Sequence, residues 1–355
     1  MSLDTLTPDK YQQQIINLSL ERTAIVKGVA GSGKSFLLLK KAKQASTKEN
    51  SSFAIIVYTK SLKQFFVDEL KEIDASGKNV YYYAQWMKLE EKPDVDYLFV
   101  DETQDFGPID IDDFRSHGKY CWFFGDSDQS IMAFPDHPVQ PIEETERQLG
   151  IQAYVLRSHH RLTIENAKVG EYILPQTQLS NACTKHGSNP KLIQTDNQLD
   201  KIIEYVESGM TDIGILVYFN YQVTDIRNYF KSKSIPVEWK SHDYMYLDFK
   251  STNPKIITWH CSKGVQFNNV FLPYCGVDET RNVLNIKQNP AKECRQYGDL
   301  RPMIIYPNAL YVATTRPLEN LYIIYTDNLT PRLPQEQSSI YDNNVTSNIK
   351  ADLPF

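Results

Sequence analysis

The stretch GVAGSGKS, at residues 28–35, decides the fold of this chain. It matches the pattern G-x-x-x-x-G-K-[ST] and follows an apolar run at residues 24–26, which is typical of a buried strand. In such a strand–loop–helix unit, glycines let backbone N–H groups approach phosphate oxygens, and the N-terminus of the next helix adds a positive dipole. The stretch therefore predicts a phosphate-binding loop, although a glycine-rich turn without function would also fit this motif alone.

The residues of this loop have expected roles at a nucleoside triphosphate. Lys34 would pair with the β- and γ-phosphates of ATP, and Ser35 would bind Mg²⁺. The backbone of the whole stretch would surround the phosphates, through Gly28, Val29, Ala30, Gly31, Ser32, Gly33, Lys34 and Ser35.

Two further polar segments follow apolar runs, DETQD at residues 101–105 and GDSDQS at residues 125–130. If both runs are parallel strands, these segments meet at the carboxyl edge of one sheet, beside the phosphate loop. Asp101 could then hold Mg²⁺, directly or through water, while Glu102 orients or deprotonates the attacking water. Gln129 could sense the γ-phosphate. Taken alone, the Asp–Glu pair would fit a solvated turn, and Gln129 a turn amide.

The same pattern of short apolar runs and helical segments continues through the second half of the chain. Apolar runs recur at residues 213–217, 255–259, 270–272 and 321–325. Apolar residues have helical spacing at residues 61–72 in the first half and at residues 223–231 in the second. This pattern predicts an α/β fold with two doubly wound, largely parallel sheets. A proline-rich stretch predicts a domain boundary near residue 150, which divides the chain into domains at residues 1–150 and 151–329. Residues 330–355 form a polar tail, either a strap or disordered.

Composition indicates a cytoplasmic protein. The chain has five cysteines, none in a C-x-x-C pair, no apolar stretch long enough to span a membrane, and no signal pattern at its N-terminus. Its 38 basic and 44 acidic residues give a formal net charge of −6, so a nucleic acid would have to bind in a local groove. Cys183 and His186 have the spacing of metal ligands but lack a second pair, so no zinc site is expected.

The motifs as a set resemble the UvrD/Rep/PcrA group of superfamily 1 helicases over residues 6–326. LTPDKYQQQII resembles the N-terminal glutamine motif, VYTKSLKQFF motif Ia, DETQD motif II and GDSDQSIMAF motif III. LRSHHRLTIEN is similar to motif IV, TWHCSKGVQF to motif V and ALYVATTR to motif VI. The resemblance implies two tandem RecA-like P-loop NTPase domains, with the ATP site in the cleft between them.

The resemblance also implies further nucleotide contacts. Gln12 would read adenine, although Gln13 and Gln14 leave the register open, and His160 would stack on adenine where the family has tyrosine. Motif V contributes Gly264 and Gln266, of which Gln266 replaces the glutamate expected at the ribose. Two arginines would neutralise transition-state charge from the second domain, namely Arg161 and Arg316.

For nucleic acid, the resemblance implies base stacking by Tyr58 and Phe134, with core packing as the alternative for each. Backbone contacts would come from Thr59, Lys60, His260 and Lys263. Motif Ib is reduced at best to YYAQW, at residues 82–86. The connections at residues 88–96 and 220–254 are too short for the accessory subdomains that large unwinding helicases of the family insert there.

The sequence thus predicts a Mg²⁺-dependent ATPase that translocates on single-stranded DNA, with the 3′-to-5′ polarity of the family and with RNA as a possible substrate. The alternative is an ATP-dependent switch or regulatory subunit of a DNA repair or defence complex, without unwinding activity of its own. Such a subunit would act on a protein partner such as a nuclease. The acidic net charge and the reduced motif Ib favour this alternative.

Overall fold

The computed structural model describes residues 7–73, 75–132, 137–240, 247–248, 251–277 and 302–342. They form two compact units, one containing the described residues up to His160 and the other those from Arg161 onward. The first unit extends beyond residue 150, where the sequence placed the boundary, because β6 (Tyr154–Leu156) still pairs with β1 (Ala24–Gly28).

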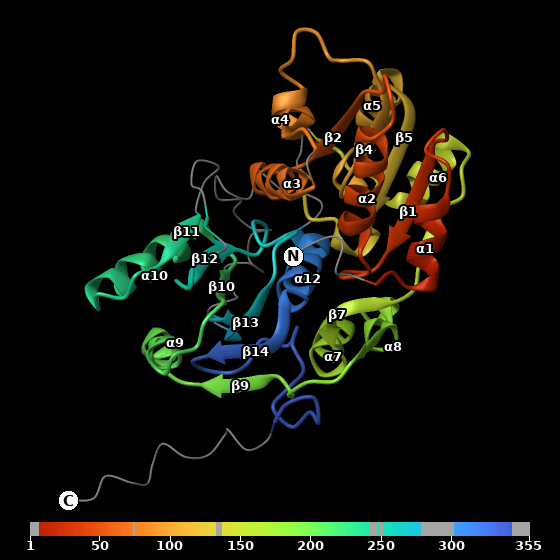
Figure 1. The fold of residues 1–355 in the computed structure, drawn as a ribbon. Helices are drawn as coiled ribbons and strands as arrows, with labels where there is room; N and C mark the ends of the chain where they lie inside the picture. Colours follow the sequence, from red (N-terminus) through yellow and green to blue (C-terminus); the bar gives the residue numbers. More distant parts are fainter. Residues whose placement is uncertain are drawn as a thin grey trace, which may run out of the picture. The chain divides into compact units, whose positions relative to one another are not determined.

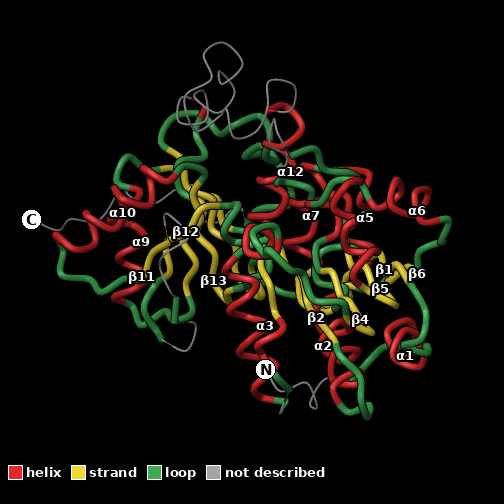
Figure 2. Tube along the Cα trace, turned by 90° about the horizontal axis from the view of Figure 1, so that it is seen from above, coloured by secondary structure: helices red, strands yellow, loops and turns green. Residues whose placement is uncertain are grey.

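The first unit is built on a sheet of six parallel strands in the order β3-β2-β4-β5-β1-β6. Figure 1 labels β1, β2, β4 and β5, and Figure 2 shows β2, β4, β5, β1 and β6 side by side. The remaining strands are β2 (Phe53–Val57), β3 (Val80–Tyr82), β4 (Val95–Val100) and β5 (Gly118–Gly125). The helices are α1 (Lys10–Asn17), α2 (Lys34–Ser46), α3 (Lys60–Glu72), α4 (Tyr83–Trp86), α5 (Pro108–His117) and α6 (Ile142–Leu149), with the 3₁₀ turns η1 (Gly77–Asn79), η2 (Thr103–Asp105) and η3 (Ser127–Gln129).

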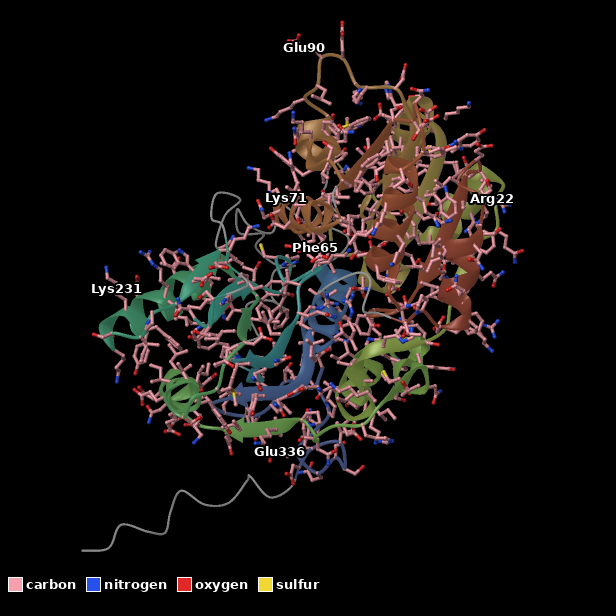
Figure 3. All side chains as sticks on the ribbon, in the orientation of Figure 1. Arg22, Phe65, Lys71, Glu90, Lys231 and Glu336 are labelled. Carbon is pink, nitrogen blue, oxygen red and sulfur yellow. The ribbon has the colours of Figure 1, made fainter. Side chains whose placement is uncertain are left out.

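Both faces of this sheet are buried, which explains why its strands read as continuous apolar runs. In β2, Phe53, Ile55 and Val57 pack with α2 and α3, whereas Ala54 and Ile56 pack on the opposite side with α4, α5 and α6. Figure 3 shows Phe65 on α3, where it packs against the first of these two clusters. The alternation gives a doubly wound layer, so the loops at the carboxyl ends of the strands stay available for a site.

Polar side chains cap the N-termini of α1 and α3, two helices that carry motif residues. The Asp9 side chain accepts a hydrogen bond from Gln12 N at the start of α1, and Thr59 Oγ1 accepts one from Leu62 N at the start of α3. Such caps satisfy donors that the first helical turn leaves unpaired. Both helices therefore begin at residues fixed by the sequence.

The second unit repeats the architecture with six parallel strands in the order β11-β12-β10-β13-β14-β9. They are β9 (Lys191–Gln194), β10 (Ile213–Val217), β11 (Glu238–Lys240), β12 (Lys255–Thr258), β13 (Phe267–Leu272) and β14 (Pro317–Tyr325). A two-stranded sheet joins β7 (His159–Thr163) to β8 (Cys183–Lys185). The helices are α7 (Ile164–Ile173), α8 (Leu179–Ala182), α9 (Gln198–Glu207), α10 (Asn220–Ser232) and α12 (Pro302–Thr314), with the turn η4 (Pro175–Thr177).

The first part of the polar tail packs against the second unit. Leu333 and Tyr341 are buried, and Thr330 N donates to Cys275 O at 2.9 Å. Glu336, labelled in Figure 3, accepts a hydrogen bond from the Tyr325 hydroxyl at 2.6 Å. Of the two sequence-based interpretations, the strap holds for residues 330–342; residues 343–355 lie outside the described part of the chain.

Every apolar run used in the sequence prediction coincides with a strand, although Trp259 lies just beyond β12, whereas β3, β6, β9 and β11 were not expected as strands of the sheets. All four lie at sheet edges and are short: β3, β6 and β11 have three residues and β9 has four, too few for a clear pattern. Among the described residues, no helix combines the length and the hydrophobicity that a membrane crossing requires.

Candidate nucleotide and nucleic-acid site

The phosphate loop joins β1 to α2 and depends on two glycines with positive φ. Gly31 has a φ of +73°, and a Cβ there would come within 2.3 Å of the His159 ring. Gly33 has a φ of +90°, and a Cβ there would come within 2.4 Å of Gln12 Nε2. A side chain would be strained by the backbone conformation at both positions, and at Gly31 it would also collide with the His159 ring.

Gln12 contacts this loop directly. Its Nε2 donates to Ser32 O at 3.0 Å, and its Oε1 accepts from Asp9 N at 3.1 Å. Gln13, in contrast, bonds to Asn17 on the exposed side of α1. The structure therefore selects Gln12 from the three adjacent glutamines as the one at the loop, while its contact with adenine stays a prediction.

Lys34 is buried at the start of α2. Its Nζ donates to Gly28 O at 2.7 Å and to Val29 O at 3.2 Å, so its ammonium group lies inside the loop. The Ser32 hydroxyl is also buried and has no hydrogen-bond partner among the described residues. Charged and polar donors concentrated around loop backbone suit phosphate oxygens.

The residues expected to bind Mg²⁺ lie side by side. Ser35 Oγ donates to Asp101 Oδ2 at 3.2 Å, whereas the buried Asp101 Oδ1 has no hydrogen-bond partner in the described structure. Burial, reinforced by the neighbouring Glu102, raises the pKa of Asp101, while Lys34 partly offsets this effect. An unsatisfied carboxylate oxygen next to a hydroxyl fits Mg²⁺, a cation that takes few protein oxygens and completes its shell with phosphate and water.

Glu102 adopts a left-handed backbone conformation directly after Asp101, with a φ of +52°. For a residue other than glycine, asparagine or aspartate this conformation is uncommon and costs about 1 kcal/mol or more. This left-handed conformation turns the chain sharply at the carboxyl end of β4, where η2 begins. The buried Glu102 side chain accepts a hydrogen bond from Gln104 Nε2 at 2.6 Å.

A chain of hydrogen bonds links motif II to motif III. Gln104 Oε1 accepts from Asp126 N at 2.8 Å, and Asp126 Oδ2 accepts from Gln129 Nε2 at 2.7 Å. Burial raises the pKa of Asp126, and Lys34 partly offsets the effect. Glu102 and Gln129, both predicted, are thus connected through Gln104 and Asp126. Sequence reasoning missed these two, although both stand inside the polar segments that mark the strand ends.

His160 lies beside the phosphate loop in the first unit. Its N donates to Gly31 O at 3.2 Å, and its Nε2 is 3.0 Å from Asp9 Oδ2. His159, which the prediction did not use, is buried against Gly31. The pair of histidines therefore connects the loop with the N-terminal cap of α1, and the stacking of His160 on adenine stays a prediction.

In the second unit, Arg161 Nη1 donates to Gln266 Oε1 at 2.9 Å, and burial lowers the pKa of Arg161. Gly264 has a φ of +83° at the turn before Gln266. Arg316 is buried at the end of α12, where its Nε donates to Val312 O and its Nη2 to Thr315 Oγ1. Motif IV and motif V are thus in contact through Arg161 and Gln266. The Arg316 guanidinium is bonded to residues that closely precede it in the chain, Val312 and Thr315.

The predicted nucleic-acid residues differ in accessibility. Tyr58 is half-buried in an aromatic group, Thr59 caps α3, and the Lys60 ammonium lies 5.3 Å from the Tyr82 ring centre. His260 and Lys263 are buried, and burial lowers the pKa of His260 to about 4, with a further contribution from Lys263. His260 is therefore neutral at pH 7. Phe134 lies outside the described residues.

No group of three or more metal-ligating histidine, cysteine or acidic side chains occurs within the described ranges. His186 instead lies 3.0 Å from the Glu165 carboxylate, and Cys183 Sγ bonds to Leu179 O.

A phosphate loop after the first strand, a buried acidic pair after another, and parallel sheets in both units together define a P-loop NTPase with RecA-like domains. The model of the viral superfamily 1 RNA helicase core domain matches residues 24–216, more than half of the 355 residues, and the chain belongs to this family. The chain therefore contains a helicase core domain. No curated protein matches the chain.

A solved structure shares this fold. Dbp5 of S. cerevisiae, bound to RNA and ADP BeF3, aligns with 92% of this chain and 85% of its own, at a TM-score of 0.57 and 12% identity. The arterivirus nonstructural protein 10 helicase aligns with 91% of this chain at a TM-score of 0.43 and 17% identity, and this chain spans 63% of its length. The predicted α/β fold with RecA-like domains and parallel sheets is therefore confirmed.

Proposed function

We propose that this chain hydrolyses ATP with Mg²⁺ and uses the energy to translocate along single-stranded nucleic acid. The observation that carries the proposal is the pairing of Ser35 with Asp101, whose second carboxylate oxygen is buried without a hydrogen-bond partner. Next to the Lys34 ammonium, this arrangement suits a nucleotide–metal complex better than an apolar ligand.

In this proposal the described residues divide the work. The loop backbone and Lys34 bind the phosphates, and Ser35 and Asp101 hold Mg²⁺, which neutralises phosphate charge when bound. Glu102 orients the attacking water and accepts its proton. The hydrogen bonds through Gln104 and Asp126 hold the Glu102 and Gln129 side chains in fixed positions relative to each other. Arg161 and Arg316 stabilise the charge that develops in the transition state.

The motif set favours the UvrD type, with single-stranded DNA as the track and 3′-to-5′ movement. RNA is the competing substrate, because the matching family model is that of an RNA helicase core. Tyr58 would stack on a base, and Thr59, Lys60, His260 and Lys263 would contact the backbone. Translocation needs only these contacts, so strand separation is not part of the proposal.

The test is the rate of ATP hydrolysis with and without single-stranded DNA or RNA, measured from about 50 to 200 mM salt. We expect one of the two strands to accelerate hydrolysis, with a half-saturating concentration that rises with salt. A directional assay on strands blocked at either end then gives the polarity. If neither strand accelerates hydrolysis, the switch subunit that acts on a protein partner becomes the better account, and the net charge of −6 would fit it.

A further inference from the structure

The first turn of α6 packs directly against motif III in the first unit. The Ile142 side chain is buried, and a Cβ at Gly125, where β5 ends, would come within 2.4 Å of Ile142 Cδ1. Ile142 N donates a hydrogen bond to Ser127 Oγ at 3.0 Å, which satisfies a donor that the first helical turn leaves unpaired. The end of β5 and the turn η3, which carries Gln129, therefore both contact the start of α6.

Glu143, the next residue of α6, joins this turn to the strand that precedes the phosphate loop. Its Oε2 accepts a hydrogen bond from Ser127 Oγ at 2.7 Å, and its Oε1 forms an ion pair with Lys27 Nζ. Lys27 lies in β1 and directly precedes Gly28, where the phosphate loop begins. One carboxylate thus connects β1 with η3, and each of its oxygens bonds to a different partner.

The strand register brings these partners together. Lys27 pairs with Gly125 of β5 in the parallel sheet. Because side chains alternate along a strand, Lys27 points to the same face of the sheet as Ile25, which packs in one cluster with Ile142 of α6. The ammonium group therefore lies on the face that α6 covers. A lysine in this otherwise apolar strand is explained by its pairing with Glu143.

The ion pair contributes little to stability by itself. The side chains of Lys27 and Glu143 keep 34% and 41% of their surface exposed, so water and salt screen their charges. The hydrogen bond from Ser127 adds a directional constraint on the carboxylate. This geometry therefore suits a contact that positions η3 better than one that stabilises the whole unit.

We propose that Glu143 is a positioning residue, which holds η3 against β1 so that Gln129 stays aligned with the γ-phosphate at the phosphate loop. The inference rests on the proposed function, in which Lys34 binds this phosphate and Gln129 senses it. Loss of the Glu143 carboxylate would let η3 shift while the loop and Lys34 stay in place. It should therefore slow hydrolysis and leave nucleotide binding nearly unchanged.

The first experiment measures kcat and KM for ATP in Glu143→Gln. The amide carries no charge to attract Lys27, and it replaces one of the two acceptor oxygens with a donor. We expect kcat to fall about threefold to tenfold and KM to change by less than about twofold. The matched control is Glu144→Gln, which removes the neighbouring carboxylate, paired with Arg147, and should keep both constants. An increase confined to KM would overturn the inference.

The second experiment separates positioning from a general loss of stability. In a Gln129→Ala background, Glu143→Gln should lower kcat no further, because its effect passes through Gln129. Losses that multiply in the double variant would contradict the inference. If Gln129→Ala alone keeps the wild-type kcat, the proposed role of Gln129 fails and the inference fails with it. A loss of kcat in Gln129→Ala but not in Glu143→Gln overturns the inference alone.

The third measurement does not depend on hydrolysis. Hydrogen exchange of the backbone amides at residues 126–130, in the full chain without nucleotide, reports local opening of η3. Glu143→Gln should increase this exchange rate about threefold or more, whereas Glu144→Gln should leave it unchanged. Wild-type exchange in Glu143→Gln would overturn the inference even if hydrolysis slows. If the wild-type chain hydrolyses no ATP, the proposed function fails, and the exchange rate alone decides whether Glu143 holds η3.

Discussion

At the scale of single residues, the nucleotide site gathers groups that are costly to bury. Asp101, Glu102 and Asp126 are three buried carboxyl groups around one buried ammonium, that of Lys34. Their mutual repulsion is relieved by hydrogen bonds from Ser35, Gln104 and Gln129 and would be relieved further by a divalent cation. The roles of Asp101 and Glu102 could be predicted from the sequence because the pair directly follows an apolar strand, whereas those of Asp126 and Gln104 were missed. The bonds among them could not be predicted, since they depend on side-chain directions at neighbouring strand ends.

Two substitutions separate nucleotide binding from hydrolysis. Lys34→Ala should abolish binding of ATP, because it removes the ammonium group from the phosphate loop. Glu102→Gln should keep binding but lower kcat by about 100-fold to 10,000-fold, because it removes the proposed base and leaves Asp101 in place. Fluorescent-nucleotide titration and steady-state ATPase assays give the two quantities. Wild-type turnover in Glu102→Gln would contradict its role.

The two arginines of the second unit should affect the transition state more than the ground state. Arg161→Ala and Arg316→Ala should each lower kcat by at least about tenfold while KM changes little. Arg22→Ala is the matched control, since Arg22 is exposed on the first unit (Figure 3) and should leave both constants unchanged. An increase confined to KM in the two test variants would show that these arginines only bind nucleotide.

At the scale of elements, side-chain contacts from α2 hold the end of α1, the helix that carries Gln12. Lys41 of α2 is fully buried, and its Nζ donates to Ile16 O at 3.0 Å and to Leu18 O at 2.6 Å, at the end of α1. The ammonium also lies 4.7 Å from the Trp122 ring centre. The sequence could not predict this contact, because a lysine at a helical position usually faces solvent. Here the carbonyls that end α1 need donors, and Lys41 supplies them.

Burial lowers the pKa of Lys41 to about 8 from its usual 10.5, which makes stability depend on pH. Between these two values the unfolded chain binds more protons, so the free energy of unfolding should increase with pH, by no more than about 3 kcal/mol. Urea denaturation at several pH values measures this rise. Lys41→Met should remove it, whereas Lys43→Met, which changes a partly exposed lysine of the same helix, should keep it.

At the scale of the whole molecule, the two units share a parallel architecture but differ at their ends. The strap at residues 330–342 completes the second unit with buried Leu333 and Tyr341, and the first unit has no counterpart in the described chain. This packing could not be predicted from the polar composition of the tail, because it depends on only a few apolar side chains that are irregularly spaced in the sequence.

Removal of the strap should destabilise the second unit. A chain that ends at Leu329 loses Leu333 and Tyr341, and burial of each such side chain is worth about 1.5 to 3 kcal/mol. We expect a Tm several degrees lower for the transition of this unit in calorimetry. A chain that ends at Asp342 keeps these contacts and is the control. Equal Tm values for the two truncated chains would show that the strap adds no stability.

The strand order of the first sheet has a consequence for synthesis on the ribosome. Of the strands of this sheet, β1, which leads into the phosphate loop, is the first to leave the exit tunnel, but its neighbours are β5 and β6, the last two strands of the unit. About 130 further residues must therefore be synthesised before both strands that pair with β1 are present. A chain arrested before β6 would expose the apolar side chains of β1 and have no formed nucleotide site, which makes this interval the period when chaperones are most needed.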